Sequence, residues 1–568
     1  MRRALVPLLV LAVCGSMPAA SSKPKDAPPS RLRFTAAEGE SLLVHGEYPP
    51  TQSSCVDPTQ PVLHARYRGT VEVLRAADGS LSLIGELAFE DYLKGIAEVP
   101  RDWPMEALKA QVVAARTYAL NRLLGGAASG EYDLCATTEC QVYVGMKVEA
   151  GPNGSRWVQA VDETAGQALL YKGQPASTYY SSTSPGRTFD VEDVFGGEPL
   201  PYLRGAPEKD DHASPVARWR VEMPFDDLVR FLTNQGLWSG GPIRSIQATA
   251  GSIEISGAGT RRASLSKEDL RDALNSTASC LAPDRYPTRE PDGYRLPQTV
   301  PSRWYRAAQE GNAIVLQGRG WGHGIGMVQW GAYGKAERGM TYDDILAAYY
   351  GGLRPEPTDG PGVIRILIAD GLTRLAVAPS GEATVEPGPA PAGPWLVTGG
   401  RGVRLSKGDR PAPALQATGF TAAPRARAGQ PYIASLTVSD DASVALEFLG
   451  GGDDAASSQA VVLEEEENQV EISVPDLPAG RYDVRAVVSD GVDVVTTAAL
   501  PVRIRPFSES ASPTEPPTAE PSGVAIPAAS ENEGSFPLLP IALAILFLGL
   551  VIGLVALTRR RGKGLHRA

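Results

Sequence analysis

The sequence of 568 residues predicts an α+β protein made of several domains. Three observations lead to this prediction. Strand-like and helical patterns are mixed between about residues 32 and 355, whereas residues 410–506 show only the alternation that is typical of strands. Both ends have the composition of targeting segments. The net charge of −11 argues against a nucleic-acid-binding protein, and no motif calls for a metal or a cofactor.

The two ends predict a protein that is exported and anchored at the cell surface. Residues 1–22 have a basic start, an apolar run and small residues, which is the order of a secretory signal peptide. The uncharged run 538–557 is long enough to form a C-terminal transmembrane helix. Because arginines follow it directly, we expect residues 558–568 to be a cytoplasmic tail and the body to lie outside the cell. Residues 508–535, rich in Pro, Ser, Thr and Glu, predict a disordered linker.

The cysteines fit an oxidising compartment. Cys14 is removed with the signal peptide, and an even number of cysteines remains. Cys135 and Cys140 enclose four residues, so a local disulfide is expected, and Cys55–Cys280 would be the long-range pair. A zinc site is the alternative, but it needs His, Cys or carboxylate ligands at short spacing, and no histidine lies between His64 and His212.

The mixed region is expected to begin with strands and a long helix. Residues 62–93 alternate as strands around the Asp78-Gly79 turn. Residues 103–124 predict a helix, with Pro104 in its first turn. Apolar residues recur there at steps of three or four, which predicts one buried stripe. The stripe consists of Leu108, Val112, Ala115, Ala119 and Leu123.

The middle of the mixed region predicts a small α/β insertion. Before it, residues 168–182 predict strands joined by the Lys172-Gly173 turn, and residues 184–197 predict a polar loop. The insertion itself is expected at about 205–300. Its expected elements are helices near 225–233 and 267–275 and strands near 243–256.

The part beyond residue 326 predicts two helices and then only strands. The second helix has Thr341 and Asp344 as a capping box and ends at Gly351. Residues 363–406 predict a small β module. Residues 410–506 predict a β-sandwich of Ig-like type, although the Cys–Trp–Cys pattern of antibody domains is missing.

Glycine occupies every second position in the stretch GRGWGHGIG, residues 318–326, which we call the glycine ladder. If this stretch is extended, one of its faces is bare backbone, because side chains alternate along a strand. A bare face allows another backbone or a flat ligand to come very close. The opposite face would carry Arg319, Trp321, His323, Ile325 and Met327.

Four stretches together resemble the SpoIID/LytB family, and they span about residues 32–355. They are EDYLKGIAEVPRDWPMEALKAQVVAARTYAL, YYSSTSPGRT, LRDALNS and GWGHGIGMVQWGAYGKAERGMTYDDILAAYYGG. The resemblance implies a SpoIID-like domain that acts on bacterial peptidoglycan. One branch of the family cuts glycan strands as a lytic transglycosylase, and the other stimulates an N-acetylmuramoyl-L-alanine amidase. By the same resemblance, Glu98 in the tripeptide EVP is the catalytic acid.

A single carboxyl group is chemically sufficient for a lytic transglycosylase. Most glycosidases need a second carboxylate as nucleophile or to activate water. In a lytic transglycosylase the 6-hydroxyl of the sugar attacks, so one residue can give a proton and take one back. The apolar neighbours of Glu98 would raise its pKa, whereas the helix N-terminus near Pro104 would lower it, and the sequence does not rank the two. The alternative is a solvated or capping carboxylate.

The family motifs also suggest substrate-binding residues. Lys109 and Arg116 could bind substrate, pair with Glu98 or form an ordinary solvated helix face. We expect the other candidates to bind sugar hydroxyls, to stack on a sugar ring or to support Glu98, with a purely structural role as the alternative for His323. These candidates are Tyr180, Ser182, Thr188, Trp321, His323 and Gln329. Pro185 stands where the family usually has a Gly-Gly pair, which predicts a stiffer loop.

The sequence is compatible with three functions. The expectation is an enzyme that cleaves peptidoglycan glycan strands. The rival is a non-catalytic peptidoglycan-binding enhancer, with a cell-wall amidase as its partner. A third interpretation is an adhesin that works mainly through residues 410–506.

Overall fold

Two β-sheets are each built from segments that lie far apart in the sequence, before residue 136 and after residue 362. The computed structural model describes residues 30–49, 63–124, 130–239, 241–249, 251–282, 284–286, 299–450, 455–464 and 467–505. The predicted signal peptide, linker, membrane span and tail lie outside these residues. Within the described part, no helix has both the length and the apolar character needed to cross a bilayer.

The six-stranded sheet has the order β20-β1-β4-β5-β18-β6, and the five-stranded sheet has the order β22-β21-β19-β2-β3. The first consists of β1 (Arg31–Ala36), β4 (Thr70–Arg75), β5 (Leu81–Ala88), β6 (Leu134–Cys135), β18 (Val363–Leu372) and β20 (Ala383–Glu386). The second consists of β2 (Leu42–Glu47), β3 (His64–Tyr67), β19 (Arg374–Pro379), β21 (Trp395–Thr398) and β22 (Arg404–Lys407). Their apolar faces contribute to the largest core of the molecule.

Residues 363–406 therefore do not form the separate β module that the sequence predicts. Strand β18 pairs with β5, β19 with β2, and β20 with β1, all antiparallel. Without these partners, β5, β2 and β1 would be edges with unpaired backbone groups. The later segment completes sheets that the N-terminal segment begins.

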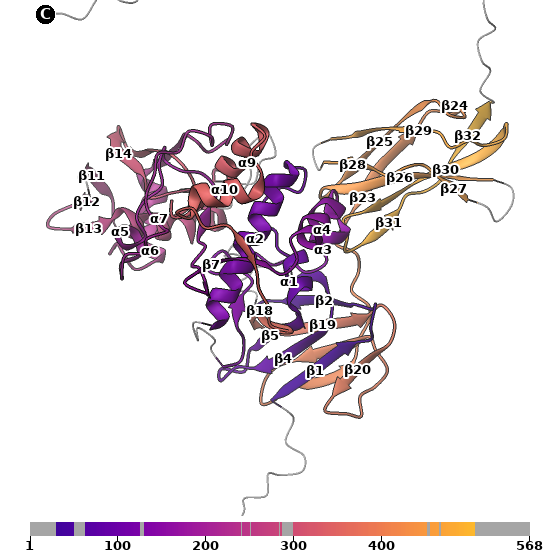
Figure 1. Ribbon diagram of the computed structural model, residues 1–568, viewed down its shortest axis with the longest axis horizontal. Coiled ribbons are helices and arrows are strands. Elements are labelled where there is room, and N and C mark those ends of the chain that lie inside the picture. The colour runs from indigo at the N-terminus through magenta and orange to yellow at the C-terminus, as the bar shows by residue number, and fades with distance from the viewer. Residues whose placement is uncertain are drawn as a thin grey trace, which may run out of the picture. The chain divides into compact units, whose positions relative to one another are not determined.

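Helix α2 (Met105–Leu124) is the long helix expected at 103–124, and it packs against α4, α9, α10 and β7 (Figure 1). The predicted stripe is buried from Leu108 to Ala119, and Leu123 packs partly buried against the same core. The other helices of this layer are α1 (Phe89–Lys94), α3 (Lys147–Ala150), α4 (Gly154–Glu163), α5 (Val191–Phe195), α9 (Gln329–Glu337) and α10 (Tyr342–Tyr349). Short strands join them: β7 (Gln167–Tyr171), β8 (Gln174–Pro175), β9 (Tyr180–Ser181), β16 (Met327–Val328) and β17 (Pro355–Pro357).

Two local expectations in this layer are wrong. The expected loop 184–197 contains the short helix α5, which starts after Asp190. Thr341 is the N-cap residue of α10, but its hydroxyl accepts no backbone hydrogen bond and instead lies within hydrogen-bond distance of the carboxylates of Asp343 and Asp344. The capping box is therefore absent. The end of the helix is as predicted, because Gly351 follows it with a φ of 59°.

The insertion has its own apolar core and contains the expected elements. Its first sheet has the order β10-β15-β14 and its second β11-β12-β13. Its strands are β10 (Trp219–Pro224), β11 (Ile243–Ala248), β12 (Ser252–Gly257), β13 (Arg262–Ser266), β14 (Tyr305–Glu310) and β15 (Ala313–Gly318). Its helices are α6 (Phe225–Asn234), α7 (Lys267–Asn275) and α8 (Ala278–Leu281).

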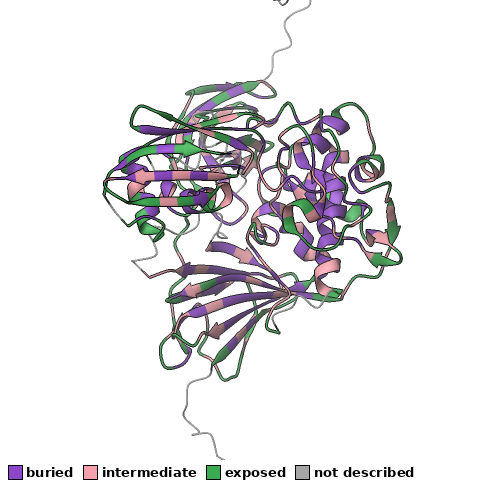
Figure 2. Ribbon diagram, turned by 90° about the vertical axis from the view of Figure 1, so that its left-hand side faces the viewer, coloured by how far each residue is buried: buried purple, intermediate pink, exposed green. Residues whose placement is uncertain are grey.

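The last described region, 417–505, forms two sheets around one apolar core, as expected for a β-sandwich. Along β25 (Pro431–Val438) and β26 (Ala442–Leu449), buried residues alternate with partly buried or exposed ones. Figure 2 shows such alternation of buried and more exposed residues along strands of the protein. One sheet consists of β23 (Ala417–Ala422), β25 (Pro431–Val438) and β29 (Gln469–Ser473). The other consists of β24 (Arg425–Arg427), β26 (Ala442–Leu449), β27 (Ala455–Ser457), β28 (Val461–Leu463), β30 (Gly480–Ser489), β31 (Val494–Thr496) and β32 (Leu500–Arg505).

Candidate active site

A cavity of about 590 Å³ collects most of the predicted site residues. Its lining comes from the Glu98 segment, the loop before Gln141, residues 179–182, the insertion and the glycine ladder. Six of the nine candidates line it: Glu98, Tyr180, Ser182, Trp321, His323 and Gln329. Segments more than 200 residues apart in the sequence therefore meet around one carboxyl group.

The glycine ladder is not an extended strand. Strand β15 ends at Gly318 and β16 begins at Met327. Gly320, Gly322, Gly324 and Gly326 between them have φ values from 68° to 98°. Residues with side chains rarely adopt this backbone conformation, so glycine is needed at every second position.

The ladder nevertheless allows the close approach of another backbone that the sequence suggests. A Cβ atom on Gly326 would lie 2.1 Å from the carbonyl oxygen of Tyr179, and one on Gly320 would lie 2.6 Å from that of Thr183. The Trp321 N–H donates to Thr183 O at 2.8 Å, and the Thr183 N–H donates to Trp321 O at 3.1 Å. This contact places the side chains of both segments in the same cavity.

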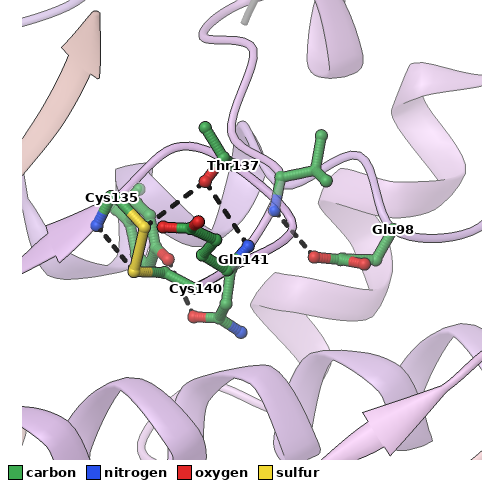
Figure 3. Close-up of a disulfide and its surroundings, with 8 residues drawn as sticks. Glu98, Cys135, Thr137, Cys140 and Gln141 are labelled. Carbon is green, nitrogen blue, oxygen red and sulfur yellow. Dashed lines mark hydrogen bonds between the residues drawn. A yellow bond between two sulfur atoms is a disulfide. The ribbon is translucent and has the colours of Figure 1, made fainter. Parts of the chain in front are cut away.

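Glu98 follows α1 and precedes α2, and its side chain is partly buried in the cavity. Its Oε1 accepts a 2.7 Å hydrogen bond from the N–H of Val142 (Figure 3). Burial raises the pKa of Glu98 to about 7, with opposite contributions from the Val142 N–H and the side chains of Tyr180 and Gln329. Burial outweighs the hydrogen bonds that favour the charged form, in the direction that the apolar neighbours in the sequence suggest. A substantial fraction of the carboxyl is therefore protonated near neutral pH.

Val142 lies two residues after a loop that is closed by the predicted disulfide between Cys135 and Cys140, whose Cα atoms are 5.4 Å apart. Figure 3 shows Glu98 beside this loop, with Thr137 and Gln141 on it. Cys280 is also disulfide-bonded, but Cys55 lies outside the described residues, so that pairing stays a prediction.

Gln141 positions Tyr180, which the sequence does select. The buried Gln141 amide donates to the Tyr180 hydroxyl at 2.9 Å and accepts from the Tyr92 hydroxyl at 2.8 Å. Sequence reasoning missed Gln141 and Val142. Val142 acts through its backbone, which no residue pattern encodes, and only the nearby cysteine pair marks this loop in the sequence.

Gln329 and His323 line the cavity and form hydrogen bonds with neighbouring segments. The Gln329 amide donates to the backbone oxygen of Glu98 at 3.3 Å and to the side chain of Gln111 at 3.2 Å. Nδ1 of His323 accepts a 3.0 Å hydrogen bond from the Ile325 N–H, so the ring proton of the neutral form is on Nε2. Burial lowers the pKa of His323 to about 4. His323 is thus neutral near pH 7 and is not a proton donor of the imidazolium type.

The other three candidates lie outside the cavity lining and have structural partners. Arg116 is buried and forms a two-point ion pair with Glu90, at 3.0 and 2.7 Å. Lys109 pairs with Glu163 at 2.6 Å, and neither residue pairs with Glu98 as had been considered. The Thr188 hydroxyl accepts from the backbone N–H of Ala206 at 2.9 Å. These three residues therefore have structural roles in the fold, which accounts for their place in the family motifs.

The insertion adds residues to the cavity that the sequence analysis did not select. Helix α7 contributes Arg271, which donates to Glu268 at 2.9 Å and to the backbone oxygen of Val300 at 3.1 Å. The signal was present, because Arg271 belongs to the motif LRDALNS. Aromatic residues Tyr118, Tyr179 and Phe195 complete the lining. Among the residues that the structure describes, no group of three or more His, Cys, Asp or Glu side chains is arranged to hold a metal ion.

The arrangement can move a proton at one position. The pKa shift of Glu98 comes from burial and from hydrogen bonds to uncharged groups, not from another carboxylate. Hydroxyl and amide groups surround it, and indole and phenol rings offer flat faces for a ring-shaped ligand. This suits general acid catalysis on a hydroxyl-rich substrate.

Comparison with known proteins supports one family. The model of the family described as Stage II sporulation protein, SpoIID, matches residues 77–171. An uncharacterised protein of Brachyspira hyodysenteriae is 35% identical over 282 residues, which cover 48% of this chain and 68% of that protein. The amidase enhancer of Bacillus subtilis is 29% identical over 294 residues, 46% of this chain but only 39% of the enhancer. Stage II sporulation protein D of B. subtilis is 26% identical over 305 residues, 51% of this chain and 80% of that protein.

Solved structures add nothing to this conclusion. Latent PorU from Porphyromonas gingivalis matches 27% of this chain and 14% of its own at 16% identity, with a TM-score of 0.14, too low for any argument. The family model and the relatives together lead to one conclusion: the chain belongs to the SpoIID/LytB family.

Proposed function

We propose that this protein cleaves the glycan strands of bacterial peptidoglycan as a lytic transglycosylase, with Glu98 as general acid and then general base. Membership of the SpoIID/LytB family supports a role at the cell wall. The observation that carries the enzyme proposal is the pKa of Glu98, about 7, in a cavity lined by aromatic and hydrogen-bonding side chains. A carboxyl group of this kind can both give and take a proton near neutral pH.

The reaction needs no second carboxylate. The protonated carboxyl of Glu98 gives its proton to the oxygen that links two sugars, and the bond from that oxygen to C1 breaks. The 6-hydroxyl oxygen of the same sugar bonds to C1, and its proton passes to the Glu98 carboxylate. The products are a free hydroxyl on one fragment and a 1,6-anhydro ring on the other, and Glu98 returns to its starting state.

The neighbours of Glu98 have positioning roles in this proposal. The Val142 N–H holds Oε1 at 2.7 Å, which leaves Oε2 to carry the proton. The side chain of Tyr180, itself held by Gln141, helps to stabilise the carboxylate after it has lost its proton. Trp321 offers a ring for stacking on a sugar, and Ser182 offers a hydroxyl.

The test is the product of glycan strands treated with the purified chain, analysed by mass spectrometry. We expect 1,6-anhydro ends from the wild type and none from Glu98→Gln, which keeps the size of the side chain but cannot supply the proton. Glu139→Gln is the matched control, because Glu139 is an exposed acid at the same cavity. Intact strands after treatment with folded wild type would refute the proposal.

A second candidate is a non-catalytic enhancer of a cell-wall amidase, favoured by the similarity to the B. subtilis amidase enhancer. Binding of glycan strands without cleavage, together with faster peptide release by an added amidase, would support it. Glu98→Gln would leave that stimulation unchanged, whereas the enzyme proposal requires loss of activity.

For its location, we propose that the chain is anchored at the cell surface by residues 538–557, with its body outside. The signal-like residues 1–22 and the arginines after residue 557 support this arrangement. Protease added to intact cells would remove the body but spare the tail. Full protection of the body would contradict the proposal.

A further inference from the structure

A second cavity, of about 1170 Å³, lies at one end of the sheet β10-β15-β14 in the insertion. It is lined by six cationic side chains: Arg218, Arg220, Lys267, Arg303, Arg306 and Arg319. Glu268 is the one acid in its lining, and that carboxylate already accepts from Arg271 at 2.9 Å. So many cations in one cavity are unusual for a chain with a net charge of −11.

Most of these cations are available to a ligand. Arg220 pairs with Glu222 and Glu310, and Lys267 donates to the backbone oxygen of Tyr305. Arg218, Arg303, Arg306 and Arg319 form no ion pair with any residue that the structure describes. Four guanidinium groups are therefore free to bind anionic oxygens, which the planar fork of arginine matches well.

Strand pairing and a fixed tryptophan ring determine the shape of this cavity, so its cations are not a chance group of surface charges. Strand pairing places Trp219 and Tyr305 on either side of Gly318, and Arg220 and Arg306 on either side of the preceding residue, Gln317. A Cβ atom on Gly318 would lie 2.0 Å from the Trp219 ring, so the first glycine of the ladder makes room for this indole. The Trp219 N–H donates to Gly320 O at 3.0 Å and fixes the ring.

Arg303 is held by a stack of aromatic rings. Its guanidinium lies 4.8 Å from the centre of the Trp304 ring, and Trp304 stacks on Phe189 with ring centres 4.0 Å apart at an angle of 12°. Stacking uses the face of the guanidinium and leaves its N–H edges for hydrogen bonds. Phe189 in turn packs beside Gly324 of the ladder.

The second cavity adjoins the candidate active site, because Glu268 and Arg303 line both. We propose that it is an anionic subsite that binds the carboxylate groups carried by the glycan strand next to the sugars held at Glu98. This inference rests on the proposed function, since it assigns the same strand to both cavities. The shared chemistry is a carboxylate on a sugar chain, whether a free lactyl group or the end of a stem peptide.

The test measures binding with Glu98→Gln as the background, so that no strand is cleaved. The variant adds Arg218→Gln, Arg306→Gln and Arg319→Gln, three exposed arginines that line only the second cavity. The matched control adds Arg230→Gln, Arg244→Gln and Arg261→Gln, which remove the same charge from exposed positions of the insertion outside both cavities. The probes are peptide-free glycan strands, peptide-bearing strands, neutral N-acetylglucosamine oligomers and a glycerol phosphate polymer.

We expect the variant to weaken binding of carboxylate-bearing strands about tenfold or more, because each lost charge-assisted hydrogen bond contributes to affinity. The salt dependence of binding should fall as well. Binding of neutral oligomers and binding by the control variant should not change. Whether the loss occurs with peptide-free or peptide-bearing strands identifies the source of the carboxylate.

Equal binding by the variant and its background, or equal losses in the control, would overturn the inference. So would an arginine-dependent affinity for the glycerol phosphate polymer alone. Failure of the proposed function would look different, because cleavage would be absent while this binding assay still gave its answer. Conversely, failure here would leave Glu98-dependent cleavage intact.

Discussion

The backbone N–H of Val142 donates a 2.7 Å hydrogen bond to Oε1 of Glu98, across 44 residues of sequence. Val142 lies two residues after Cys140, whose disulfide with Cys135 closes the preceding loop. Because the donor is a backbone group, the position of the carboxyl depends on the shape of this loop rather than on the side chain of Val142.

The raised pKa of Glu98 predicts a stability difference that depends on pH. The pKa is 4.5 in the unfolded reference and about 7 in the folded protein, so the folded state binds this proton more tightly. The wild type therefore loses free energy of unfolding as the pH rises from about 4.5 to 7, and Glu98→Gln does not lose this contribution. Between pH 4.5 and 7, the free energy of unfolding of the variant relative to that of the wild type should rise by up to about 3 kcal/mol. Chemical denaturation at several pH values measures the difference, and a constant value would contradict the assignment.

Tyr180→Phe should move the alkaline limb of the pH–activity profile. Activity requires protonated Glu98 and should fall as the pH rises through about 7. The Tyr180 side chain lowers the pKa of Glu98, so removing its hydroxyl should shift the limb to higher pH by roughly 0.5–1 unit. Tyr179→Phe is the control, because that ring lines the cavity but does not contribute to the pKa of Glu98. A shift to lower pH in Tyr180→Phe would show that the hydroxyl acts in the opposite sense.

Replacing Cys135 and Cys140 together by serine should lower both stability and activity. The closed loop is short, so the loss in free energy of unfolding should be about 2 kcal/mol. Activity should fall even at temperatures where the variant is still folded. The reason is that Gln141 and Val142, which contact Tyr180 and Glu98, directly follow the loop that the disulfide closes. Serine variants are preferable to a reducing agent, which would also act on the disulfide of Cys280. An unchanged rate in the folded variant would show that the loop holds Glu98 without the bond.

Gly326→Ala tests the close approach of the ladder to residues 179–184. The new Cβ would lie 2.1 Å from a backbone oxygen, at a φ of 68°. Gly339→Ala is matched, since Gly339 has a φ of 82° but nothing within 4 Å. Urea unfolding should show a loss of about 1 kcal/mol for Gly339→Ala from backbone strain alone. For Gly326→Ala the loss should be about 3 kcal/mol or more, because the backbones must move apart. Equal losses would mean that the contact is loose.

The sequence by itself determined the features that depend on near neighbours along the chain. The buried stripe of α2 follows from apolar residues at steps of three and four, and the Lys172-Gly173 turn from its glycine. The helices of the insertion and the Cys135–Cys140 disulfide were predicted for the same reason. The family motifs, not the spacing of residues, led to Glu98.

Only the tertiary structure decided what these elements do together. In it, β18 pairs with β5, the buried Arg116 forms an ion pair with Glu90, and the backbone N–H of Val142 donates to Glu98. It also gathered arginines from three strand ends into one cavity beside the candidate active site. Strand pairing, burial and pKa depend on which distant segments meet, and local periodicity carries no information about that choice.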